Sequence, residues 1–183
     1  MVFNLNKEKI AGYLIFIGVA QFFIFMMISE SLYPGYSISK NYISDLGVGS
    51  TSYIFNTSII FMGILLIISA FLLEGKVLKL FLILSGIGAA GVGFFPEGSP
   101  YHLHTIMSLI VFLFASLSSY ATFKYKSYKN ILWPIMGTIG LVSLILYILN
   151  IYGPFNYGGM ERLIVYPNLI WSLGFSGYLM KVK

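Results

Sequence analysis

Apolar residues fall in six long runs along the chain, and short segments rich in charged and turn-forming residues separate them. A helix that crosses a bilayer needs about 20 mostly apolar residues. The runs that meet this condition are residues 10–29, 53–73, 78–95, 103–123, 131–151 and 163–180. The pattern predicts an all-α polytopic membrane protein whose six transmembrane helices form one bundle, a single domain over residues 1–183.

The third run contains an unusual number of small residues. They are Gly86, Gly88, Ala89, Ala90, Gly91 and Gly93. Small side chains let neighbouring helices approach closely in lipid. We therefore expect the helix over 78–95 to be the most enclosed of the six.

Composition supports a membrane protein and excludes a water-soluble one. Hydrophobic residues make up 58% of the chain and charged residues 9%, whereas a soluble domain is about 25% charged because its surface stays in water. The chain contains no cysteine. Disulfides, thiolate nucleophiles and cysteine-bound metals are therefore excluded.

Basic residues are distributed unevenly between the two predicted sides of the membrane. One side holds nine of them: Lys7, Lys9, Lys76, Lys79, Lys124, Lys126, Lys129, Lys181 and Lys183. The other side holds Lys40 and Arg162. Because positive charge is retained on the cytoplasmic side, we predict a multi-pass protein of the cell membrane with both termini cytoplasmic. The clustering at helix ends also argues against nucleic acid as a partner, despite the net charge of +5.

Groups capable of acid–base chemistry collect at the predicted outer ends of the helices. They are Glu30, Asp45, Glu97, His102, His104 and Glu161. The turn between the third and fourth runs is short, so Glu97 and His104 are expected to be neighbours. Ser108 follows His104 by four residues and shares its helical face.

Two further predicted helices bring polar side chains to the same level. Asn56 lies about one turn inside the second run, and Glu161 shares a helical face with Val165 and Asn168. Polar groups at this depth are costly in lipid and normally turn inward. The sequence thus predicts an outward-facing polar pocket at the outer leaflet.

Several of these residues have a structural alternative. Asp45 is also suited to ordering a turn or capping the second helix, and Glu97 and Arg162 are suited to a buried ion pair that fixes the helix ends. His102 and His104 are two residues apart, so on a helix their rings point to different sides. They form a poor chelating pair unless the backbone there is extended.

Short motifs lie at or near the predicted helix ends along nearly the whole chain. In order they are Tyr33-Pro34-Gly35-Tyr36-Ser37, Ile43-Ser44-Asp45-Leu46-Gly47, Phe55-Asn56, Phe95-Pro96, Leu103-His104, Gly159-Met160-Glu161-Arg162-Leu163 and Trp171. This order resembles the prokaryotic integral membrane proteins grouped as domain of unknown function 998. That family is similar in turn to the Frag1, DRAM and Sfk1 group of six-helix membrane proteins, which are associated with autophagy, lipid-anchor maturation and lipid organisation.

The resemblance implies a ligand-binding site made of Asp45, Asn56, Glu97, His104, Glu161 and Arg162. The candidates for catalysis are Asp45, Glu97, His104 and Ser108, and Ser108 is added from its position alone. The candidates for metal ligands are His102 and His104, with zinc as the metal.

Three functions stay open at this point. The first is a lipid-interacting protein whose partners are membrane lipids, with Arg162 and Lys40 facing phosphate. The second is a metal-dependent intramembrane hydrolase of a lipid ester or amide, in which a zinc-bound water attacks the substrate. The third is a transporter or a small subunit of a membrane complex.

Overall fold

The computed structural model describes residues 6–123, 125 and 129–181. Lys124, Lys126 and Lys183, which contribute to the lysine distribution, lie outside the described residues. The described part contains six α-helices: α1 (Lys7–Leu32), α2 (Ser52–Leu72), α3 (Lys76–Phe94), α4 (Leu103–Thr122), α5 (Leu132–Ile148) and α6 (Asn156–Lys181). Short 3₁₀ helices lie between them: η1 (Ser44–Gly47), η2 (Gly49–Thr51), η3 (Pro100–His102) and η5 (Gly153–Phe155).

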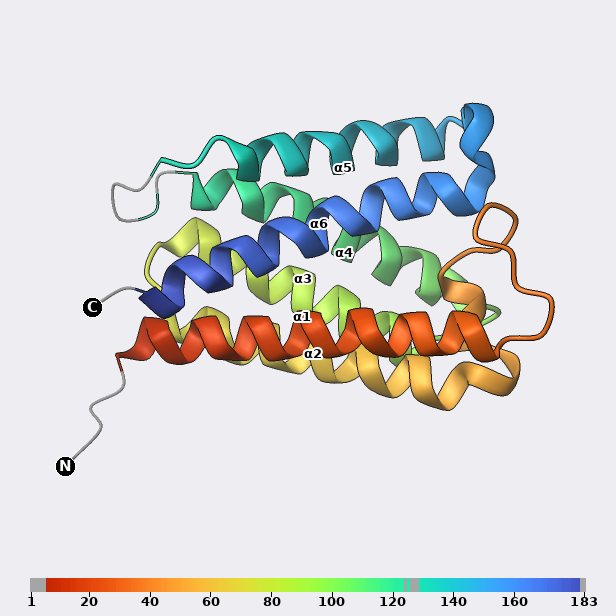
Figure 1. Ribbon diagram of the computed structural model, residues 1–183, viewed down its shortest axis with the longest axis horizontal. Helices are drawn as coiled ribbons and strands as arrows, with labels where there is room; N and C mark the ends of the chain where they lie inside the picture. Colours follow the sequence, from red (N-terminus) through yellow and green to blue (C-terminus); the bar gives the residue numbers. More distant parts are fainter. Residues whose placement is uncertain (1–5, 124, 126–128, 182–183) are drawn as a thin grey trace.

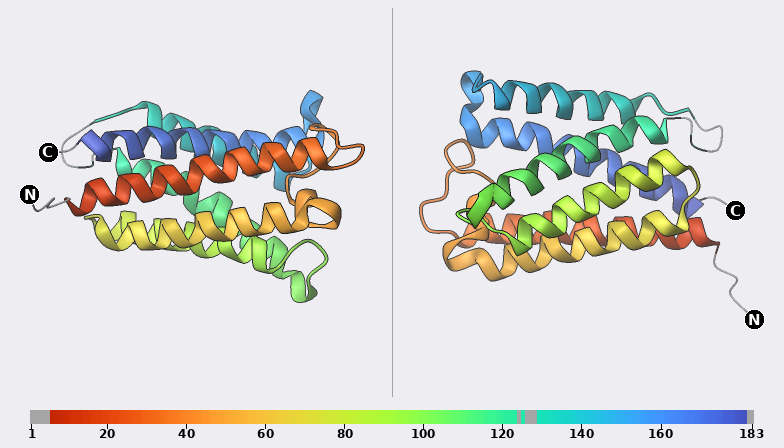
Figure 2. Two further views of the ribbon diagram at one scale, coloured as in Figure 1. Left: turned by 60° about the horizontal axis from the view of Figure 1, so that its bottom comes forward. Right: turned by 180° about the vertical axis from the view of Figure 1, so that it is seen from behind.

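The six helices form a closed ring in chain order. Each helix packs against the next, and α6 packs against α1 to close the ring. The helices lie along the long axis of the molecule (Figure 1). The start of α1 and the end of α6 lie at one end, which we call the inner end, and the loop between α1 and α2 lies at the other, the outer end (Figures 1 and 2). This arrangement confirms six helices in one bundle.

Five of these helices are long and apolar enough to cross a membrane, whereas α5 is apolar but has 17 residues. At 1.5 Å per residue, α5 is about 25 Å long, slightly less than the roughly 30 Å of a bilayer's hydrocarbon core. The predicted run over 131–151 is shortened because Asn150 adopts a left-handed conformation with φ of 57°. Asparagine tolerates that conformation better than most residues, and the helix ends before it.

The last helix begins at Asn156, earlier than the predicted start at 163. Glu161 and Arg162 therefore lie inside α6. Gly158 lets the α1–α2 loop pack against the first turn of α6, because a Cβ atom at this position would meet the carbonyl oxygens of Ile38 and Asn41 in that loop. The Gly158 N–H donates to the Ser39 carbonyl at 3.1 Å, which holds the loop against the helix.

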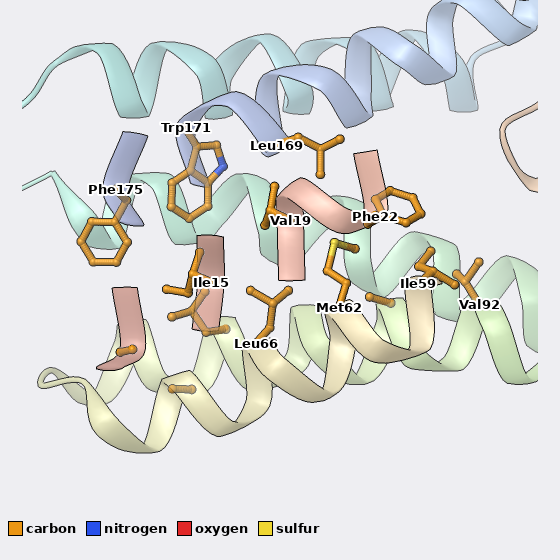
Figure 3. Close-up of a cluster of buried hydrophobic side chains, with 14 of the residues drawn as sticks. Ile15, Val19, Phe22, Ile59, Met62, Leu66, Val92, Leu169, Trp171 and Phe175 are labelled. Carbon is orange, nitrogen blue, oxygen red and sulfur yellow. The ribbon is translucent and has the colours of Figure 1, made fainter. Parts of the chain in front are cut away.

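An apolar core runs along the inside of the ring (Figure 3). It includes Val19 and Phe22 from α1, Met62 and Leu66 from α2, and Phe175 from α6, all at most 7% exposed. Among the five candidate spans, α3 has the largest buried share, which confirms the expectation for the glycine-rich helix.

The contact between α2 and α3 shows how glycines permit that burial. A Cβ atom added to Gly63 would lie 2.5 Å from the Gly86 carbonyl oxygen, and one added to Gly86 would lie 2.6 Å from the Gly63 carbonyl oxygen. The two backbones therefore touch at this point. Such close approach is how helices associate in lipid, where burial from water gives no driving force.

Candidate functional site

A cavity of about 80 Å³ lies inside the ring of helices. Its wall is formed by α1, α2, α3, α4, α6 and the segment that leads into η1, and most of the lining side chains are apolar. The polar lining residues are Ser44, Ser85, Ser108, Glu161, Asn168 and Ser172. One water molecule needs about 10–15 Å³ on this measure, so the cavity has room for several waters or a short apolar segment.

Glu161 brings a carboxyl group to the cavity wall. Its side chain is 5% exposed, and one carboxylate oxygen accepts a hydrogen bond from the Ile43 N–H. Val165 and Asn168 also line the cavity. The predicted helical face shared by Glu161, Val165 and Asn168 is therefore confirmed.

Asn168 belongs to a polar network deeper in the bundle. Its amide nitrogen donates to the Ser116 hydroxyl at 2.9 Å, and its side-chain oxygen accepts from the Trp171 indole N–H at 3.0 Å. Ser116 is fully buried and was not recognised from the sequence. The available signal was the group Ser116, Ser118 and Ser119 inside an otherwise apolar run.

His104 and Ser108 form a pair on the first turns of α4. The His104 Nδ1 lies 2.9 Å from the Phe95 carbonyl oxygen, and its Nε2 lies 3.3 Å from the Ser108 hydroxyl. Ser108 lines the cavity, so the pair connects the end of α3 to the cavity wall. The expected shared face of His104 and Ser108 is confirmed.

The two histidines have different surroundings in the described part of the chain. Both His104 ring nitrogens have protein partners, while His102 is exposed and has a positive φ of 55°. Among the described residues, no group of three or more His, Asp or Glu side chains is placed to hold a metal ion. These residues therefore do not supply the ligands that the zinc hypothesis requires.

Asp45 orders the loop in which it lies. One of its oxygens accepts from the Asn41 amide at 2.8 Å and from the Tyr42 N–H at 3.1 Å. Asp45 therefore orders the turn, which is one of the two structural roles that the sequence suggested for it. The other alternative, a cap on α2, does not occur, because the cap position of that helix is Thr51 and has no side-chain cap bond.

Glu97 pairs with Asp45 across two outer loops. Although Glu97 is exposed, partial burial together with the hydrogen bond to Asp45 and its negative charge raises the pKa of Glu97 to about 7. Two carboxyl groups this close favour sharing one proton. The pair lies outside the cavity lining.

Arg162 is surrounded by acceptors from its own chain. Its Nη2 donates to the Glu30 carboxylate at 2.7 Å and to the Tyr36 hydroxyl at 2.6 Å. Its Nη1 donates to the carbonyl oxygens of Ile38, Asn41 and Gly158. The predicted ion pair between Glu97 and Arg162 is therefore wrong, because the guanidinium is paired with Glu30.

The surroundings of Arg162 also affect Tyr36. Burial raises the pKa of the Tyr36 hydroxyl, although the adjacent Arg162 cation opposes that shift. The neutral hydroxyl accepts from Arg162 and donates to the Tyr42 carbonyl at 3.0 Å. Arg162 thus fixes the path of the α1–α2 loop, and Lys40 on that loop is exposed.

Asn56 fixes η1 to the start of α2. Its amide nitrogen donates to the Gly47 carbonyl at 2.9 Å, while its Oδ1 atom is buried and has no hydrogen-bond partner among the residues that the structure describes. A Cβ atom at Gly47 would lie 2.7 Å from that oxygen. Asn56 therefore supports the loop and lies outside the cavity lining.

A second polar cluster lies at the inner end and was missed from the sequence. The Tyr125 hydroxyl donates to the Glu8 carboxylate at 2.5 Å and accepts from the Glu74 N–H at 3.3 Å. Glu8 is 3% exposed. The three residues come from distant parts of the chain, so no local spacing indicated the contact.

The fold and its apolar helices define an integral membrane protein with several membrane-spanning helices. The family model described as protein of unknown function (DUF998) matches residues 16–177, and the chain belongs to this family. No curated protein and no solved structure matches the chain. The more distant similarity to the Frag1, DRAM and Sfk1 group stays a prediction.

Proposed function

We propose that the protein binds a membrane lipid, with an apolar segment of the lipid in the central cavity and a polar group of the lipid beside Glu161. The observation that carries the proposal is a largely apolar cavity with one buried carboxyl group on its wall. Apolar cavities in proteins stay dry and accept apolar guests. A buried carboxyl group beside such a guest needs a hydrogen-bond partner.

The polar group of the lipid decides the selectivity in this proposal. A lipid tail leaves one apolar environment for another when it enters the cavity, so its transfer gives little net hydrophobic gain. Glu161 accepts hydrogen bonds, and the hydroxyls of Ser44 and Ser108 lie on the same cavity wall. A lipid with a hydroxyl or amine group near its apolar segment fits this arrangement.

Arg162 has a supporting part in the proposal. Its side chain is 5% exposed and its Nη atoms donate to protein acceptors, so phosphate binding is not assigned to it. It holds the α1–α2 loop in place, and that loop carries Ile43 and Ser44 on the cavity wall. The metal-dependent hydrolase is not proposed, because the described residues lack a third ligand. A transporter or subunit role stays a prediction.

The proposal is tested by filling the cavity. Val165 lines it, whereas Val142 lies on α5, which contributes no residue to the cavity lining, and is 50% exposed. Val165→Phe and Val142→Phe are therefore matched variants that add the same volume in the two places. Purification in mild detergent followed by native mass spectrometry measures the lipid that each variant retains.

We expect the wild type and Val142→Phe to retain a stoichiometric lipid and Val165→Phe to lose it. The masses of the retained species identify the lipid class. Equal retention by both folded variants, or no retained lipid in the wild type after supply of total bacterial lipid extract, contradicts the proposal.

A further inference from the structure

Ser108 differs from eight other described serines of the helices in the partner of its hydroxyl. Hydroxyls inside helices commonly bond to a carbonyl oxygen of the preceding turn. The serines that do so here are Ser58, Ser69, Ser85, Ser116, Ser118, Ser119, Ser172 and Ser176. The Ser108 hydroxyl instead lies 3.3 Å from the His104 Nε2.

The hydrogen bond at His104 Nδ1 determines whether His104 Nε2 donates to the Ser108 hydroxyl or accepts from it. A carbonyl oxygen accepts hydrogen bonds and cannot donate them, so the 2.9 Å contact with the Phe95 carbonyl oxygen places the proton on Nδ1. Neutral His104 then has a lone pair on Nε2, directed at the Ser108 hydroxyl. A hydroxyl activated by an adjacent base that is itself oriented by a third group is the arrangement of a serine nucleophile.

The position of Ser108 gives this pair access to a ligand. Ser108 lines the central cavity, and His104 lies on the same helix one turn nearer the outer end. An apolar chain in the cavity would therefore pass beside the hydroxyl.

We infer that Ser108 and His104 are a nucleophile–base pair that hydrolyses an ester-linked acyl lipid. This inference rests on the proposed binding of lipid in the cavity. The Ser108 oxygen attacks the ester carbonyl carbon while His104 Nε2 takes the hydroxyl proton. The ester C–O bond breaks, the lipid alcohol leaves with the proton from His104, and the acyl group stays on Ser108. Water then attacks the acyl carbonyl carbon while His104 Nε2 takes its proton. The bond between the acyl carbon and the Ser108 oxygen breaks, the proton returns from His104 to Ser108, and a fatty acid leaves.

A serine-directed probe tests the nucleophile. An alkyl fluorophosphonate is added to the purified protein in lipid nanodiscs, and peptide mass spectrometry locates the adduct. We expect an adduct on Ser108, none there in Ser108→Ala, and labelling slower by about 100-fold or more in His104→Gln, the range for loss of a general base. An unmodified Ser108, or labelling at an equal rate in His104→Gln, overturns the inference.

Single-cysteine variants test the pair without relying on the probe. Because the chain has no cysteine, Ser108→Cys and Ser85→Cys each introduce one thiol on the wall of the same cavity, and the Ser85 hydroxyl bonds to its own helix. The rate at which methyl methanethiosulfonate converts each thiol into a methyl mixed disulfide is measured from pH 5 to pH 9. We expect Ser108→Cys to react at lower pH than Ser85→Cys, and His104→Gln in the same chain to remove the difference.

Coincident pH profiles for the two thiols contradict the pairing. Lipid retention by Ser108→Ala separates this inference from the proposed function. Retained lipid without a Ser108 adduct rejects the hydrolase and leaves lipid binding intact, whereas equal lipid retention by folded Val165→Phe and Val142→Phe rejects the foundation of both.

Discussion

Glu161 and Arg162 are adjacent in the chain and equally buried, but they have opposite surroundings. The guanidinium of Arg162 donates to five acceptors of its own chain. The carboxyl group of Glu161 accepts from one backbone N–H and faces the cavity. Burial alone therefore does not mark a functional charge in this bundle. The Nη atoms of Arg162 are occupied by protein acceptors and support the fold, although its buried Nε has no hydrogen-bond partner among the described residues, whereas the carboxyl group of Glu161 lies on the wall of a cavity.

Removing Arg162 is expected to have the largest effect on stability. Arg162→Ala leaves the Glu30 carboxylate, which is 14% exposed, without its cation, and breaking such a pair costs about 3–5 kcal/mol. Unfolding in mixed detergent micelles measures the free energy. Lys40→Ala is the control, because Lys40 lies on the same loop and is exposed. Equal unfolding curves for the two variants contradict the structural role of Arg162.

Changing Glu161 is expected to affect the ligand more than the fold. Glu161→Gln retains an oxygen that accepts the Ile43 N–H, but it replaces the second carboxyl oxygen beside the cavity with an amide nitrogen, which donates and cannot accept. A typical hydrogen bond contributes about 0.5–1.5 kcal/mol, so binding of a hydroxyl-bearing lipid should weaken by about 2- to 10-fold. Lipid titration monitored by native mass spectrometry measures this change. Unaltered affinity contradicts a role for Glu161 in recognition.

The sequence predicted the parts of this comparison that depend on local spacing. Six apolar runs gave the six helices, and spacings of four and seven residues placed Val165 and Asn168 with Glu161. The same reasoning paired His104 with Ser108. The partner of Arg162 was not predictable in this way, because Glu30 is 132 residues away and the path of the α1–α2 loop decides which carboxylate reaches the guanidinium.

The polar cluster at the inner end tests whether ligand binding is confined to the outer end of the bundle. Tyr125→Phe removes the hydroxyl that donates to Glu8 and accepts from the Glu74 N–H. We expect a loss of about 1 kcal/mol in unfolding free energy and no change in lipid retention. Loss of retained lipid in a folded Tyr125→Phe variant would show that ligand binding extends to the inner end.

The smallest expected effect concerns pH and the pair of Asp45 and Glu97. The pKa of Glu97 is raised from 4.5 to about 7, so folding favours its protonated form. The stabilisation is complete below pH 4.5 and is lost as the pH rises through about 7. Because Glu97 is exposed, the effect should stay below about 1 kcal/mol.

Thermal unfolding between pH 4 and pH 8 measures this contribution. Glu97→Gln keeps a donor for Asp45 and cannot ionise, so its melting temperature should vary less with pH than that of the wild type. Parallel curves for the two proteins would show that the carboxyl pair does not share a proton.

The most direct test of the central claim is an experimental structure of the protein in nanodiscs made from native membrane lipid. We predict elongated density in the cavity between α1, α2, α3, α4 and α6, with a polar end within hydrogen-bond distance of the Glu161 carboxyl group. A cavity that is collapsed, or filled by side chains alone with the Glu161 carboxyl group turned to a protein partner, would contradict the account.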